Sequence, residues 1–263
     1  MWLSKVVSII LIHIIFINIC VANDLEEENF NFDRAQFVAI GKEDSEYGFL
    51  YIQQGLLIHP QAVITVADDL LYEAESLKIR TGLSQMSHYS KVAIAENVNV
   101  INVIELPETS KIVLLILEEE ILGVKLINYK HTSYDDQYNG CKLIKLGFRQ
   151  LHVDFDEVYA SLTTKEKNTQ LLSHMTDKGC PSKLNKIVDF KSSLFTDYVY
   201  CIKEIKKKNC RRNYPGASLV CRDHETNEFY LAGLVIGKSH CNWMLINTPK
   251  LHASIEAHLK TIQ

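Results

Sequence analysis

The 263-residue chain is poor in the residues that mark repetitive or extended proteins. It contains only 5 prolines and 11 glycines, and it shows no low-complexity linker and no internal repeat at solenoid or propeller spacing. Hydrophobic residues make up 47% of the sequence, enough for a chain of this length to bury a sizeable core. The formal net charge of −4 is far from the strongly basic balance of a general nucleic-acid binder, so we expect no nucleic acid among its partners.

The usual zinc-binding motifs are also missing. The sequence has no His-Glu-x-x-His and no Cys-x-x-Cys, and its histidines are scattered. We therefore predict no metal and no cofactor. Asp68 and Asp69 are adjacent, but neighbouring residues on a strand or turn point apart, which argues against a carboxylate pair that shares a proton.

The amino-terminal 22 residues have the pattern of a signal peptide. Lys5 precedes an apolar run from residue 6 to residue 20, and Val21 and Ala22 suit cleavage near Ala22. A transmembrane anchor is the alternative, but the run is short for a span and contains His13 and Asn18. We predict a secreted, extracellular protein without a membrane span after signal removal. Residues 23–37, acidic at 24–28, are expected to form a solvated tail.

Six cysteines remain beyond this leader, because Cys20 would leave with it. An even number in a secretory context predicts a disulfide framework, for which fifteen pairings are possible. The six are Cys141, Cys180, Cys201, Cys210, Cys221 and Cys241.

Short apolar segments rich in β-branched and aromatic residues predict an all-β fold. After Pro249, by contrast, Leu251, Ile255 and Leu259 recur at helical spacing and predict a C-terminal α-helix at about 250–262. The expected strands are residues 49–53, 56–66, 92–104, 112–117, 141–148, 198–202, 218–222 and 230–236.

Three segments resemble the trypsin/chymotrypsin-like serine proteases, the peptidase S1 fold. Residues 55–69 (GLLIHPQAVITVADD) are similar to the segment that ends in Thr-Ala-Ala-His-Cys, and residues 110–117 (SKIVLLIL) to Asn-Asp-Ile-Ala-Leu-Leu. Residues 210–221 (CRRNYPGASLVC) are similar to the nucleophile loop with one residue inserted. The resemblance implies one trypsin-like domain, residues 38–263. It would hold two packed antiparallel six-stranded β-barrels, at about 38–130 and 136–248, joined by a crossover near 128–139.

The same segments lack every catalytic residue of that family. Asp68 stands at the histidine position, Lys111 at the aspartate position, and Pro215 or Tyr214 at the serine position. The family mechanism needs a hydroxyl, an imidazole and an acid. Proline in addition removes one backbone N–H donor from the oxyanion hole, which alone costs a factor of about 10² to 10³ in rate. Ser218 matches the family's proline, so it restores no nucleophile.

The resemblance also implies one of the fifteen disulfide pairings. It pairs Cys141 with Cys221, Cys180 with Cys201, and Cys210 with Cys241. The bridge that spans the family's histidine loop is absent, since its positions fall at about Gln53 and Asp69.

Activation and specificity differ from the family as well. Arg34 could be cut, but no Ile-Val-Gly-Gly-like terminus follows it, so no zymogen switch is expected. The resemblance puts Lys208, Val235 and Gly237 at the former specificity pocket, and lysine at its floor excludes a preference for basic side chains. Lys208 pointing to solvent in a remodelled loop is the favoured alternative.

The densest basic cluster lies beside the former active-site rim. It consists of Lys206, Lys207, Lys208, Arg211 and Arg212. It is either a solvated loop or a site for sulfated, heparin-like polyanions.

Taken together, these features predict a secreted, catalytically inactive serine protease homologue, or pseudoprotease. The resemblance implies that it acts by protein binding, as a cofactor or decoy in an extracellular protease cascade, with a protease, a protease substrate or an inhibitor as partner. Residual serine-type endopeptidase activity and polyanion binding through Lys206–Arg212 are the alternatives.

Overall fold

The structure is a computed structural model, and it describes ten stretches of the chain. They are residues 34–44, 48–72, 77–81, 97–129, 141–149, 159–163, 198–203, 215–223, 225–239 and 242–262. All of them belong to one compact unit, Asp33–Gln263. The predicted signal peptide and most of the acidic segment lie outside the described residues, as does most of the predicted crossover.

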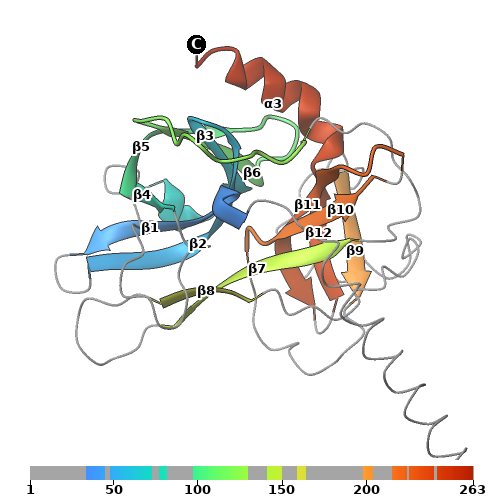
Figure 1. The fold of residues 1–263 in the computed structure, drawn as a ribbon, viewed down its shortest axis with the longest axis horizontal. Coiled ribbons are helices and arrows are strands. Elements are labelled where there is room, and N and C mark those ends of the chain that lie inside the picture. The colour runs from blue at the N-terminus through green and yellow to red at the C-terminus, as the bar shows by residue number, and fades with distance from the viewer. Residues whose placement is uncertain are drawn as a thin grey trace, which may run out of the picture. The chain divides into compact units, whose positions relative to one another are not determined.

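Six strands form a closed antiparallel barrel in the order β1-β2-β3-β6-β5-β4 (Figure 1). Their bounds are β1 Phe37–Asp44, β2 Gly48–His59, β3 Ala62–Val66, β4 Leu77–Arg80, β5 Asn97–Glu105 and β6 Ile112–Leu117. Short 3-10 turns, η1 Arg34–Gln36 and η2 Asp69–Leu71, precede β1 and follow β3. The barrel interior is filled by aliphatic side chains from every strand, among them Val38, Leu57, Val63, Ile79, Val100 and Leu115.

A second six-stranded sheet has the order β8-β7-β10-β11-β12-β9. Its strands are β7 Lys142–Arg149, β8 Tyr159–Thr163, β9 Val199–Lys203, β10 Ser218–Arg222, β11 Phe229–Ser239 and β12 Asn242–Asn247. The fully buried Trp243 of β12 packs there with Leu219, Val235 and Leu245.

The second sheet repeats the pairing pattern of the barrel. When β7 to β12 are matched in order with β1 to β6, every strand pair of the second sheet has its counterpart in the barrel. The one barrel pair without a counterpart is β2–β3, so the second sheet is open between β8 and β9 within the described residues. The structure therefore confirms a mostly β fold with one closed barrel, and it does not show the predicted second barrel as closed.

The predicted C-terminal helix is confirmed. Pro249 opens the turn η7 Pro249–Leu251, and α3 His252–Leu259 follows it directly. Leu251, Ile255 and Leu259, the residues whose spacing predicted the helix, are buried. Among the described residues, none of the helices is both long enough and apolar enough to span a membrane.

Several strand predictions need correction. The single strand expected at 56–66 is two strands, because Pro60 and Gln61 form a turn that folds β3 back on β2. The strand expected at 92–104 is described only from Asn97, and it runs on to Glu105. The strands β1, β4, β8 and β12 were not predicted.

Candidate functional site

Asp68 and Lys111, at the predicted histidine and aspartate positions, lie at the same end of the barrel. Asp68 follows β3 and Lys111 precedes β6, and these strands pair antiparallel with Val66 opposite Ile112. The pairing continues one step beyond the strands, since the N–H of Ala67 donates to the carbonyl oxygen of Lys111 at 2.8 Å. Both side chains are half-buried.

Lys111 is placed at this end of the barrel by a tight turn before β6. Ser110 has a left-handed backbone, with φ of 45°. The buried Thr109 accepts hydrogen bonds at its Oγ1 from the backbone N–H of Lys111 at 3.3 Å and of Ile112 at 3.2 Å. These bonds satisfy backbone donors before the strand ladder begins, so the turn is fixed by its own side chain.

The nucleophile-like loop is pressed against the barrel at the same place. Pro215 and Gly216 form a turn that leads into β10, and Gly216 has φ of +77°. A Cβ on Gly216 would lie 2.8 Å from Thr65 Oγ1 and closer still to the carbonyl oxygen of Gln54. Thr65 stands three residues before Asp68, so the chain brings positions 68, 111 and 215, which the resemblance compares with the catalytic residues, to one junction. Tyr214, the alternative serine position, lies outside the described residues.

A buried polar network fills this junction. Gln53 Nε2 donates to Thr65 Oγ1 at 3.0 Å and to the Val66 carbonyl at 2.6 Å. Thr65 Oγ1 in turn donates to the Gln54 carbonyl at 2.7 Å, and Gln54 Nε2 donates to the carbonyl of Ile144 on β7 at 3.3 Å. Gln53 stands where the family's histidine-loop disulfide would begin, so an amide hydrogen-bonded across β2 and β3 occupies that place. Sequence reasoning missed the network, although two successive glutamines inside an apolar strand were a visible signal.

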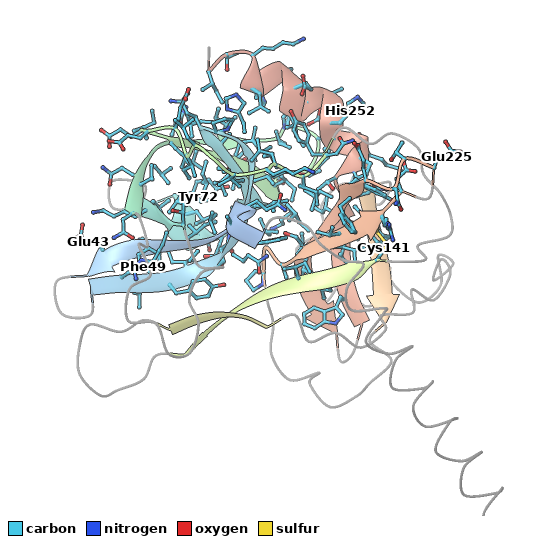
Figure 2. All side chains as sticks on the ribbon, in the orientation of Figure 1. Glu43, Phe49, Tyr72, Cys141, Glu225 and His252 are labelled. Carbon is cyan, nitrogen blue, oxygen red and sulfur yellow. A yellow bond between two sulfur atoms is a disulfide. The ribbon has the colours of Figure 1, made fainter. Side chains whose placement is uncertain are left out.

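An acidic rim, formed by Asp69 and Glu105 near Tyr72, lies at the turn that follows Asp68. The Leu71 N–H donates to the Asp68 carbonyl at 2.9 Å and closes the turn η2, which leaves Asp69 and Tyr72 exposed. Partial burial raises the pKa of Tyr72 above its ordinary value, and the hydrogen bond and charge of Glu105, then the charge of Asp69, raise it further. Tyr72 is labelled in Figure 2. At neutral pH this rim therefore carries a protonated phenol among carboxylates.

Ser218 does not supply a substitute nucleophile. Ser218 is completely buried, with 0% of its surface accessible to solvent, and its Oγ has no hydrogen-bond partner among the described atoms. It lies between Ile144 of β7 and Leu234 of β11. A hydroxyl in that position has neither a base nor access to a peptide bond.

The structure describes two of the three residues that the resemblance compares with a specificity pocket. Val235 is buried, its N–H donates to the Ala217 carbonyl at 2.9 Å, and its carbonyl accepts from the Gly216 N–H at 3.0 Å. Gly237 is buried and pairs with Met244 of β12. Lys208, and with it the whole basic cluster of Lys206, Lys207, Arg211 and Arg212, lies outside the described residues.

One of the three predicted disulfides is present. Cys141 and Cys221 are bonded, and they tie the start of β7 to β10 across 80 residues (Figure 2). Closing a loop of that length stabilises a folded chain by about 4 kcal/mol in the chain-entropy account. Cys180, Cys210, Cys241 and the side chain of Cys201 lie outside the described part, so the other two pairs remain predictions.

The described residues hold no group of three or more histidine, cysteine or acidic side chains placed to bind a metal ion. In comparisons with known proteins, no protein-family model matches the chain and no curated protein matches it. The structure thus shows a mostly β protein. It has a closed six-stranded barrel, a second sheet with the same pairing pattern and a disulfide within that sheet.

We expect Gly216→Ala to destabilise the protein by about 1–3 kcal/mol more than Gly123→Ala does. Both glycines have φ of +77°, so the backbone strain of the substitution is matched, but a Cβ at Gly123 meets nothing within 4 Å. Denaturant unfolding of the two variants measures the difference. Equal losses would show that the Gly216 turn does not press on the barrel.

We expect Gln54→Met to cost about 1–3 kcal/mol of unfolding free energy, because it leaves the buried Ile144 carbonyl without its donor. Gln61→Met is the matched control, since Gln61 is half-buried in the β2–β3 turn. Thermal unfolding should separate the two variants by several degrees. A melting temperature for Gln54→Met as high as that of the control would remove the role we assign to this bond.

Proposed function

We propose that this chain is a non-catalytic homologue of the trypsin-like serine proteases, secreted and acting by binding another protein. The partner would be a protease, a protease substrate or an inhibitor, with the chain as cofactor or decoy. Three findings support the proposal: the closed barrel, the repeated pairing pattern of the second sheet, and the Cys141–Cys221 bridge that the resemblance implied.

The observation that carries the proposal is the meeting of three distant segments at one junction. Asp68 follows β3, Lys111 precedes β6 and Pro215 lies in the turn before β10. The Ala67–Lys111 bond and the Gly216 contact bring these segments together. If the three sequence similarities were accidental, there would be no reason for the three segments to meet in the structure. If the junction is a degenerate active site, the three segments must meet there.

The chemistry of the junction supports the loss of catalysis. Its carboxylate, ammonium and pyrrolidine groups offer neither a hydroxyl nucleophile nor an imidazole base. Pro215 cannot donate to an oxyanion, and the Gly216 N–H is already bonded to Val235. Ser218, the serine that the nucleophile-like loop itself contains, is buried.

We expect no hydrolysis of a diverse peptide library by the purified secreted protein, and no labelling by a serine-reactive phosphonate, because positions 68, 111 and 215 at the junction offer neither a hydroxyl nucleophile nor an imidazole base. Pro215→Ala restores a backbone N–H without a nucleophile, so this control should be equally inactive. Turnover that the phosphonate blocks would contradict the proposal and make Ser218 the first residue to substitute.

We expect non-reducing peptide mapping by mass spectrometry to find Cys180 bonded to Cys201 and Cys210 bonded to Cys241. These pairs follow from the resemblance, and the described disulfide leaves these four cysteines to pair among themselves. Any other pairing of the four, with the protein folded, would count against the family assignment whatever the activity assay shows.

A further inference from the structure

An aromatic ring covers a glycine on the outer face of the closed barrel. In β4, Leu77 and Ile79 point into the barrel core, so Lys78 and Arg80 point outward. On the same outer face, a Cβ on Gly41 of β1 would lie 2.5 Å and 2.7 Å from two ring atoms of Phe49. Only glycine lets the ring approach the strand so closely. Figure 2 shows Phe49 at the end of the β1–β2 hairpin, near Glu43.

The guanidinium group of Arg80 stacks on this ring. The guanidinium carbon of Arg80 lies 4.3 Å from the Phe49 ring centroid, within the range of a cation–π contact. Arg80 Nε donates to Asn97 Oδ1 on β5 at 2.9 Å. The ring and the amide together fix the guanidinium, and because Nε is used, the two Nη groups form its remaining donor edge.

The charge of Arg80 has no counter-ion in the described part of the protein. Its partners there are the neutral amide of Asn97 and the ring of Phe49, while the neighbouring Lys78 is paired with Glu43. Burial lowers the pKa of Arg80. A half-buried guanidinium with open Nη donors is costly to leave alone, and a carboxylate is the group that best matches a two-pronged donor edge.

We propose that Arg80 anchors a protein-docking surface on the outer face of β1, β4 and β5, and that it takes a carboxylate of the partner end-on through Nη1 and Nη2. The surroundings fit a protein partner. Along β5, Asn97, Asn99 and Ile101 are exposed in alternation with buried residues, and Ile101 is 63% exposed. Amide and apolar groups around an arginine are the usual composition of a protein interface.

The same surroundings do not favour a polyanionic chain. A sulfated polysaccharide needs repeated cations, whereas here one cation is paired with Glu43 and Glu118 is bonded to Asn99. The surface uses none of positions 68, 111 and 215. Its test therefore does not depend on whether the proposed loss of catalysis is right.

The test uses the whole secreted protein with labelled arginine side chains. Sodium acetate, sodium sulfate and sodium chloride are titrated at equal ionic strength, and the NMR signals of the Arg80 guanidinium are followed. We expect a saturable shift with acetate that chloride does not produce. Phe49→Leu should weaken acetate binding about two- to fivefold by removing the ring, and Arg80→Lys should abolish the bidentate contact. Lys260→Met removes an exposed positive charge just after α3 and should change nothing.

Thermal unfolding first verifies that each variant is folded, and Asn97→Ala gives a second way to release the guanidinium without removing it. An acetate response identical to that of chloride would overturn the proposal. So would tighter binding of sulfate than of acetate together with earlier elution of Arg80→Lys from a heparin column, because the ligand would then be a sulfated sugar. Acetate saturation with unchanged heparin elution would support a protein carboxylate.

Discussion

The contact between the Gly216 turn and the backbone of β2 is the constraint on which the junction depends. The turn belongs to the second sheet, and the Gln54 carbonyl and Thr65 hydroxyl that it meets belong to the barrel. Those two groups are already hydrogen-bonded to each other, and the adjacent Gln54 amide reaches across to β7. The two sheets are therefore joined by packed backbone and buried hydrogen bonds. A substitution at one of these residues should change the packing of both sheets. Positions 68, 111 and 215 all lie next to this join.

The buried polar groups of this junction bear on the loss of catalysis that we propose. Catalysis by a triad needs polar side chains that stay open to a substrate, with a base and an acid held in line. Here the polar side chains nearest the turn, Gln53, Gln54 and Thr65, are buried and bonded to the protein's own backbone. Among the described residues, exposed acidic groups lie beside this junction, at Asp69 and Glu105 near Tyr72, and Arg80 lies half-buried on the outer face of the barrel.

The elements that could be predicted from the sequence are those whose apolar pattern has clear ends. The strands that were missed are recognised only by the neighbouring strands with which they pair. β6, β10 and α3 could be predicted because uninterrupted or periodic apolar residues stop at polar ones. β4 has only Leu77 and Ile79 inside, too few for a pattern, and the apolar run across Pro60 hid a hairpin. At the junction, the resemblance indicated residues 68, 111 and 215. The two successive glutamines were a visible signal of buried polar side chains, but their partners could not be predicted, because three acceptors of the network are backbone carbonyls. The stacking of Arg80 on Phe49 depends on the register of β1, which the sequence did not reveal as a strand.

The pairing pattern that the two sheets share has a consequence for the order in which they can form during synthesis. The barrel takes its strands from Phe37 to Leu117, so every partner it needs exists before the second sheet has begun. In the second sheet, as far as the described strands show, β9 pairs only with β12, the strand that is made last. Domains fold as units from the amino terminus when they can, and distant pairings are slow. The first half can thus be a finished scaffold onto which the second half, and with it the turn of Pro215 and Gly216, is fitted last.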